Sequence, residues 1–189
     1  TVAAGVLHLN AGNVKTSGAQ TYNEPVKLKS DTGLSGNGLT FADTVDSDAN
    51  GPWDLWLNSS GGGGISLNGA VGSSGQIQGL GLVSDSTINV GPSSHDVNVL
   101  AANLTGSGNS LSFTDTDNLK VGTVSGTSGI GLTSGDLTVD AGGEITQSAP
   151  ISVDKATFSA GGSAISLGNS SNDFAGDVDI GHLLRPMKL

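Results

Sequence analysis

A short acidic stretch of the chain carries oxygen ligands at the spacing of a metal site. Residues 46–51 read DSDANG, which matches the first half of a calcium-binding loop, and the twelfth position is Leu57 where an EF-hand has Glu. Oxygens two residues apart on a tight turn suit a hard cation that takes about six to eight oxygen ligands. The stretch therefore predicts either a calcium site outside the EF-hand class or an acidic, solvated loop tip. The candidate ligands are Asp46, Asp48, Asn50 and Asp54.

Two tryptophans adjoin this stretch. Trp53 and Trp56 flank Asp54, and they are two of only seven aromatic residues, beside four Phe and one Tyr. Exposed indole rings stack on sugar rings, because the ring face is partly negative and attracts C–H groups. We therefore expect Trp53 and Trp56 to form a binding loop. The alternative is a loop that folds back on the protein, with Trp56 facing outward or covering a strand.

Other residue sets indicate less chemistry. Two further D-x-D pairs, at 115–117 and 177–179, could serve polysaccharide cleavage, in which carboxylates act as acid and base. A lyase site would also need Arg or Lys beside them, and the single Arg is Arg185. A zinc site needs three or four converging ligands, whereas the three histidines are far apart, at 8, 95 and 182. We expect no catalytic residues and keep a polysaccharide-degrading enzyme as a remote alternative.

The elements that must position these residues are indicated by a phrase that occurs four times. Two apolar residues with one residue between them lead into a polar residue, then Ala or Ser, then Gly or Ser. The last two copies begin 19 residues apart, and the earlier gaps of 48 and 82 are near multiples of about 20, a period typical of solenoids. The copies are LHLNAG (7–12), LWLNSS (55–60), LTVDAG (137–142) and ATFSAG (156–161).

Between these copies, short runs alternate apolar and polar residues, which is the pattern of strands, and Gly, Asn, Asp and Ser separate the runs. Most runs are too short for a sandwich, and two or three fit in each period. We therefore expect an all-β parallel β-helix of roughly nine coils, a single repeat domain over residues 1–182, with the repeated phrase on one side of the coil. The stretch from 46 to 56 breaks the rhythm and predicts an outward loop.

Composition supports this class and limits the partners. Gly accounts for 31 of 189 residues and aromatic residues for 4%, too little for an ordinary core but enough for thin stacked rungs. Asp outnumbers Glu by 15 to 2, which favours turns over helices. A net charge of −10 with seven Lys and Arg argues against nucleic acid. There is no run of 18 apolar residues, so we expect no membrane insertion, and the lack of Cys is consistent with a secreted bacterial protein.

The last seven residues, 183–189, differ from the rest of the chain. They read LLRPMKL and hold two of the seven basic residues and the only Met. We expect this tail to be a cap, an assembly segment or a remnant of cloning.

Several phrases resemble the repeats of filamentous-haemagglutinin-like adhesins of the two-partner-secretion type in Gram-negative bacteria. The resemblance spans roughly residues 7 to 180 and implies a right-handed β-helix that is exported from the cell and acts as an adhesin, a haemagglutinin or a matrix fibre. It carries no catalytic residues. The similar phrases are TSGAQTYNEPVKL (16–28), LTF (39–41), LWLN (55–58), GAVG (69–72), ITQS (145–148), FSAGG (158–162), ISL (165–167) and NDFAGDV (172–178).

Together these features predict a structural and adhesive segment of a secreted, cell-surface protein that presents loops for attachment to a glycan or protein on a host or neighbouring cell. The alternative is a subunit of an extracellular filament that associates end to end, because uncapped solenoid ends present unpaired strand edges. Calcium is the one cofactor that the residues suggest.

Overall fold

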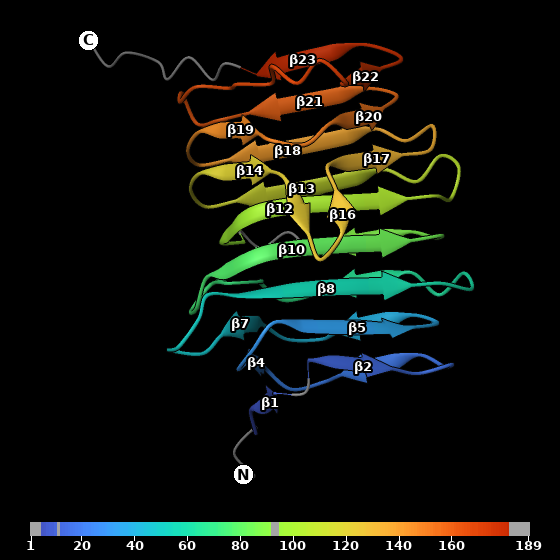
Figure 1. The fold of residues 1–189 in the computed structure, drawn as a ribbon, viewed down its shortest axis with the longest axis vertical. Coiled ribbons are helices and arrows are strands. Elements are labelled where there is room, and N and C mark those ends of the chain that lie inside the picture. The colour runs from blue at the N-terminus through green and yellow to red at the C-terminus, as the bar shows by residue number, and fades with distance from the viewer. Residues whose placement is uncertain (1–4, 11, 92–94, 182–189) are drawn as a thin grey trace.

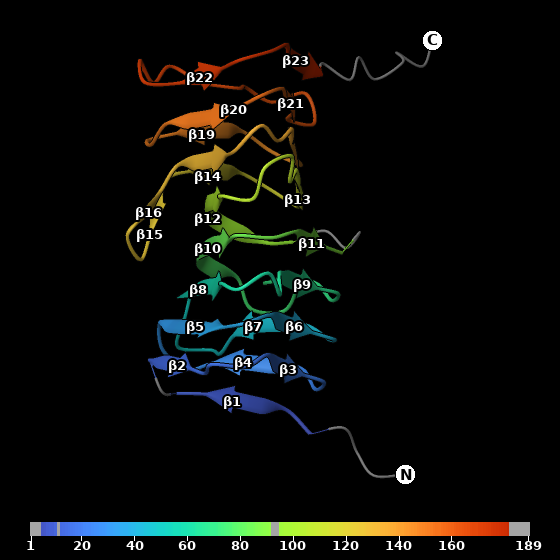
Figure 2. The ribbon, with the colours of Figure 1, turned by 90° about the vertical axis from the view of Figure 1, so that its right-hand side faces the viewer.

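The computed structural model describes residues 5–10, 12–91 and 95–181 and shows a stack of parallel strand turns. The chain climbs through about eight turns, from the N-terminus at the bottom of Figure 1 to the C-terminus at the top. Strands on the front face run from left to right as the chain climbs, so the coil is right-handed (Figures 1 and 2). The described residues form no helix, and hence no helix that could cross a membrane. The expected right-handed parallel β-helix is confirmed, with slightly fewer turns than the roughly nine predicted.

The strands of successive turns pair with one another and so form sheets. The largest sheet has ten strands: β2 (Asn13–Lys15), β5 (Thr32–Gly36), β8 (Trp53–Ser59), β10 (Ile77–Ser84), β12 (Val97–Leu104), β14 (Leu119–Val121), β17 (Ile130–Leu132), β19 (Ile145–Gln147), β20 (Ile151–Val153) and β22 (Asp173–Phe174). The first three turns add a sheet of β1 (Leu7–Leu9), β4 (Val26–Leu28) and β7 (Val45–Ser47).

Two four-stranded sheets form the remaining side, one in the lower turns and one in the upper turns. The lower sheet holds β3 (Gln20–Tyr22), β6 (Leu39–Phe41), β9 (Ile65–Leu67) and β11 (Ile88–Val90). The upper sheet holds β13 (Leu111–Asp115), β18 (Leu137–Ala141), β21 (Ala156–Ser159) and β23 (Val178–Gly181). A fifth sheet is the antiparallel hairpin of β15 (Thr123–Val124) and β16 (Thr127–Ser128).

The core consists of columns of apolar side chains that run through the stack, most of them aliphatic, with Phe41, Phe113 and Phe158 the largest. Each member of a column pairs with the equivalent residue of the next turn, and all are almost fully buried. Burying one such side chain stabilises the fold by about 1.5–3 kcal/mol, and each turn contributes only a few. One column on the largest sheet consists of Leu34, Leu57, Leu82, Ala102, Ile130 and Ile151.

Alternation along β8 decides which side chains reach the surface. Leu55 and Leu57 point into the core and are fully buried, so the residues that alternate with them, Asp54 and Trp56, lie on the outer face. The inward set follows the apolar pattern of the sequence, because a shift of one residue would expose both leucines.

Two sequence-based expectations need correction. The repeated phrase does not occupy one side of the coil: its third and fourth copies pair directly as β18 and β21, but the first forms β1 and the second ends β8, in two other sheets. The stretch 46–56 is not a free loop, because β7 and β8 include both of its ends, and only residues 48–52 link the two strands. The tail at 183–189 lies outside the described residues.

Candidate functional site

Asp46, the first candidate calcium ligand, is a buried member of β7 that holds neighbouring turns together. Its carboxylate accepts hydrogen bonds from the Ser74 backbone N–H (2.9 Å) and from Ser74 Oγ (2.8 Å). Its Oδ2 lies 3.4 Å from Lys27 Nζ, and Lys27 also donates to Ser74 Oγ at 3.0 Å. Asp46 is only 2% exposed, so this network satisfies a charge that burial would otherwise destabilise.

Asp48 and Asn50 form a closed turn of their own. The Asp48 carboxylate accepts the Asn50 backbone N–H (3.0 Å), the Asn50 side-chain amide (3.1 Å) and Trp53 Nε1 (3.0 Å). The hydrogen bond from Trp53 is the main reason that the pKa of Asp48 is lowered. These bonds tie the turn to the start of β8.

Asp54 lies on the outer face of β8 beside the preceding turn. Its backbone N–H donates to Asp31 Oδ1 at 2.9 Å. Burial, and then repulsion from Asp31, raise the pKa of Asp54. The predicted ligands thus face different partners, and the described residues hold no group of three or more His, Cys, Asp or Glu arranged for a metal ion. Calcium binding stays a prediction.

The two tryptophans of the predicted binding loop lie in different environments. Trp53 is half-buried and packs against the core, its ring nitrogen bonded to Asp48 and its backbone N–H donating to Ser47 Oγ at 3.0 Å. Trp56 lies on the outer face of β8, and its Nε1 donates to Thr127 Oγ1 at 3.0 Å. Across the sheet, Trp56 pairs with Gly33 on β5 below and with Gly81 on β10 above. Both rings are half-buried, and of the two only Trp56 lines the groove described below.

The partner of Trp56 belongs to the β15–β16 hairpin, which the sequence did not reveal. The hairpin leaves the sixth turn and hangs down over the outer face of β12 and β10 (Figures 1 and 2). Its two-residue turn, Ser125-Gly126, has φ values of 46° and 89°, as a type I′ turn requires. Val124 is 2% exposed because it packs over β10, where a Cβ on Gly79 would come within 2.8 Å of the valine.

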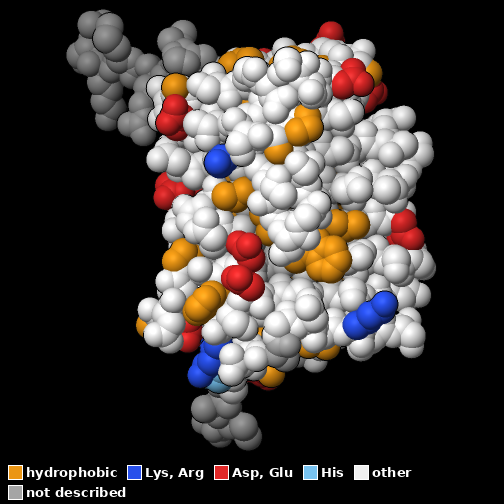
Figure 3. Space-filling model, viewed as in Figure 1, with side chains coloured by type: hydrophobic (Ala, Val, Ile, Leu, Met, Phe, Trp, Pro, Cys, Tyr) orange, Lys and Arg blue, Asp and Glu red, His pale blue; other side chains and the backbone are white. Residues whose placement is uncertain are grey.

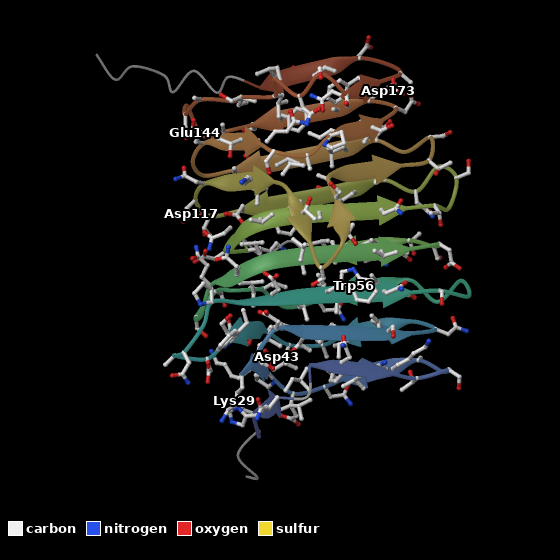
Figure 4. The ribbon with its side chains drawn as sticks, in the orientation of Figure 1. Lys29, Asp43, Trp56, Asp117, Glu144 and Asp173 are labelled. Carbon is white, nitrogen blue, oxygen red and sulfur yellow. The ribbon has the colours of Figure 1, made fainter. Side chains whose placement is uncertain are left out.

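The hairpin tip, Trp56 and the lower turns enclose a groove of about 370 Å³. Trp56 lies beneath the hairpin tip, in the middle of the face shown in Figure 4. A Cβ on Gly33 would lie 3.5 Å from the Trp56 ring, and one on Gly81 would lie 2.7 Å from it, so the ring reaches across both neighbouring strands. The groove is lined by Gly12, Asn13, Asp31, Thr32, Gly33, Trp56 and Ser125.

The groove has an aromatic floor, a few polar groups and one charge. Asn13, Asp31 and Ser125 are exposed at its edge, and Asp31 is the only charged residue among the lining residues. Much of this face is uncharged, and hydrophobic side chains reach the surface near its centre (Figure 3). An aromatic wall with a few convergent polar groups is the usual composition of a small-molecule site.

A segment in the upper turns, shorter than half of the chain, matches a known repeat. Residues 108–181 match a family model described as repeats of unknown function (DUF5649). No curated protein and no solved structure matches the chain. The matched segment includes the β15–β16 hairpin and Ser125, whereas Trp56, Asp31 and Asn13 precede it. The match supports a repeat protein and does not single out the filamentous-haemagglutinin-like adhesins.

The other candidate residues occupy structural positions. His95 and Asp115 pair across adjacent turns inside the core, where His95 Nδ1 accepts the Val71 N–H (3.0 Å) and Asp115 accepts the Val97 N–H (3.0 Å) and the Asp117 N–H (3.1 Å). Burial lowers the pKa of His95 and raises the pKa of Asp115 to about 7. The buried Asp115 carboxylate therefore holds a turn whose other acidic residue, Asp117, is exposed at the surface.

The remaining predicted residues do not join them. Asp177 and Asp179 are exposed in the last turn, and His8 is exposed on β1 in the first, while His182 lies outside the described residues.

Proposed function

We propose that the chain is a structural and adhesive segment of a secreted bacterial surface protein, in which the solenoid holds an attachment surface in a fixed place. The observation that supports this is the contrast between a continuous buried core and one inserted hairpin. The β15–β16 pair is the one antiparallel pair among the described strands, and it packs on the outer face to shape the Trp56 groove. Rigid scaffolds that carry irregular binding segments are a common arrangement in binding proteins.

Secretion rests on the resemblance of the sequence to exported adhesin repeats, and the structural role rests on the fold and the repeat match. The hydrogen-bonded turn at Asp48 and Asn50 argues that residues 46–53 brace the lower turns, whereas Trp56, which follows them, lines the groove. Attachment is thereby assigned to the groove face.

The test is a cell-adhesion measurement. Beads that carry the intact chain would be passed over epithelial and bacterial cell layers, and beads that carry an unrelated acidic protein would serve as the control. We expect the coated beads to be retained under flow when the control beads are not. Equal retention of both bead types on every layer would contradict the adhesive function.

A second function, assembly end to end, is favoured by the two ends of the stack. The large apolar side chains that are exposed among the described residues all lie on or beside the terminal strands: Val6 and Leu7 at β1, and Val178 and Ile180 on β23. Open strand edges template pairing with another chain.

The two ends also differ in charge. The first two turns carry Lys15, Lys27 and Lys29 beside Glu24 and Asp31, whereas the last turn carries Asp173, Asp177 and Asp179. Sedimentation velocity over a wide concentration range tests this, with Ile180→Lys as the variant and Thr138→Lys, on an exposed position of an interior strand, as the matched control. We expect growth of the sedimenting species that only Ile180→Lys abolishes. A monomer at all concentrations would contradict assembly.

A further inference from the structure

The groove at Trp56 has the geometry of a site for a flat ring with an apolar face. The indole spans the gap between Gly33 and Gly81, where the missing Cβ atoms leave room for it against the sheet. The hydrogen bond from its Nε1 to Thr127 Oγ1 holds the ring in this orientation. An indole that lies across neighbouring strands in this way presents its partly negative face to a ligand, and that face attracts the C–H bonds of a sugar ring.

The polar groups at the edge of the groove come from three separate parts of the chain. Asn13 lies on β2 and extends over Gly33, where its side chain would collide with a Cβ. Asp31 precedes β5, and its Oδ1 already accepts the Asp54 N–H at 2.9 Å, which leaves Oδ2 to accept from a ligand hydroxyl. An amide and a carboxylate next to an aromatic face match the alternating hydroxyl groups of a pyranose.

Ser125 gives a third and independent indication. It occupies the left-handed region at φ 46°, which a type I′ turn leaves to Asn, Asp or Gly far more often than to Ser. The strained position places a hydroxyl group at the rim of the groove. Backbone strain that persists at a groove is a sign of a functional site, since a glycine would make the same turn without strain.

Charge narrows the ligand class. The charged residue among the lining residues is Asp31, and no Lys or Arg is among them. A carboxylate without a cation repels uronic acids, sialic acids and sulfated sugars, especially on a chain of net charge −10.

We propose that this groove binds an uncharged pyranose unit of a polysaccharide, which stacks on Trp56 and bonds to Asn13, Asp31 and Ser125. The inference rests on the proposed attachment function and names its ligand class. A volume of about 370 Å³ is at the small end of ligand sites and suits one sugar ring. One ring gives a weak site, with Kd on the order of 1 mM, so attachment depends on many copies engaging one polysaccharide.

The test is retention of fluorescent beads, coated with the intact chain, on immobilised polysaccharides. The neutral probes are glucan, mannan, galactan and poly-N-acetylglucosamine, and the acidic probes are heparin, polygalacturonate and hyaluronan. We expect retention on at least one neutral probe and none on the acidic probes. No retention on any neutral probe, or stronger retention on an acidic one, would overturn the proposal.

Variants then locate the site. Trp56→Ala should weaken binding about tenfold or more, and Asn13→Ala and Ser125→Gly about threefold to tenfold each. The matched controls are Trp53→Phe, which changes the other tryptophan, and Asn58→Ala, on the outer face of the same strand but not among the lining residues. Asn13 and Ser125 are exposed, so their variants keep the test valid if Trp56→Ala fails to fold. Neutral binding that all three groove variants leave unchanged would also overturn the proposal.

Failure of the glycan groove can be distinguished from failure of the proposed attachment function. Beads that adhere to cell layers but show no retention on neutral polysaccharides that depends on Trp56 would refute the glycan groove and leave attachment standing. Beads that bind a neutral polysaccharide but no cell layer would support the groove and refute attachment to cells.

Discussion

The interior column and the Trp56 groove share strands, yet the column repeats from turn to turn and the groove does not. On β8, Leu57 continues a column of aliphatic residues that repeats in every neighbouring turn, whereas Trp56, one residue earlier, has glycines on both sides. The column is regular because each turn must fill the space left by the next. The outer face is free to vary, and there the fold accepts an inserted hairpin and a strained serine. The comparison teaches that the core specifies the stack and the irregular face carries the function.

The largest expected effect lies in the column. Leu82→Ala should lower the free energy of unfolding by about 2–5 kcal/mol, because it leaves a cavity between two buried neighbours. Urea denaturation measures the loss. The matched control is Val83→Ala, one residue along on the half-buried outer side, for which we expect less than about 1 kcal/mol. Equal losses at the two positions would break the distinction between column and face.

The hairpin should respond as a separate unit. Val124→Ser removes the apolar contact of β15 with β10 and should weaken the packing of the hairpin on the stack by about 1–2 kcal/mol. We therefore expect the hairpin to detach while the stack stays folded. Limited proteolysis should then cut within residues 123–128, with Thr123→Ala, an exposed neighbour, as the resistant control. Cooperative unfolding of the whole chain in the Val124 variant would show that the hairpin is part of the core.

The buried residues His95 and Asp115 should make the free energy of unfolding depend on pH. Burial raises the pKa of Asp115 from 3.8 in the unfolded chain to about 7, so the stability that it contributes is fully present below 3.8 and is lost as the pH rises through about 7. His95 acts in the opposite sense, because burial lowers its pKa. Its contribution is present above 6.5 and is lost as the pH falls through the lowered value.

Above pH 6.5 Asp115 is therefore the one of the two that titrates, and the free energy of unfolding should fall by on the order of 1 kcal/mol as the pH rises past about 7. Urea denaturation at a series of pH values measures this. Asp115→Asn should flatten the profile in that range, and Asp136→Asn, a surface carboxylate, should not. A profile that Asp115→Asn leaves unchanged would show that this carboxyl does not titrate there.

The smallest expected effect is at Ser125, where one substitution should raise stability and weaken binding. Ser125→Gly relieves a left-handed backbone conformation and should stabilise the chain by up to about 1 kcal/mol, while it weakens binding of neutral glycans. Thermal denaturation measures the first change and bead retention the second. Ser134→Gly, at φ 58° and outside the groove, is the matched control and should stabilise without changing binding. Identical binding in the two variants would remove Ser125 from the site.

Calcium gives a further check on the lower turns. If calcium binds there, EDTA should lower the melting temperature and added calcium should restore it, because a ligand that binds only the native state raises its stability. The carboxylates of Asp46 and Asp48 are already engaged by Ser74, Lys27, Asn50 and Trp53, and a melting temperature that EDTA leaves unchanged would contradict calcium binding.

The parts of the fold that repeat were predictable from the sequence. The period near 20 predicted the stack, and the apolar positions Leu55 and Leu57 of the repeated phrase are buried, although we predicted residues 46–56 as an outward loop and so missed the first part of β8. The side of the coil on which each copy of the phrase lies was not predictable, because loops of unequal length separate the copies and two gaps were only near multiples of the period.

The groove was predicted only in part. Trp56 was singled out as an aromatic near an acidic stretch, but Asn13 and Asp31 reach it from other turns, and that proximity depends on the register of β2, β5 and β8. The hairpin escaped notice because each of its strands has two residues, too few for an alternating pattern. The signal was present in Val124-Ser125-Gly126-Thr127, a two-residue turn between β-branched residues, but Ser is a weak marker of a type I′ turn.

The central claim is tested most directly by the indole N–H signals in an NMR titration. The chain has two tryptophans and therefore two such signals, one from Trp56 in the groove and one from Trp53, whose indole N–H donates to Asp48. Neutral oligosaccharides of glucose, mannose, galactose and N-acetylglucosamine would be added in turn. The account predicts that at least one of them shifts the Trp56 signal in a saturable manner while the Trp53 signal stays in place. A Trp56 signal that none of them moves, or equal shifts of both signals, would contradict it.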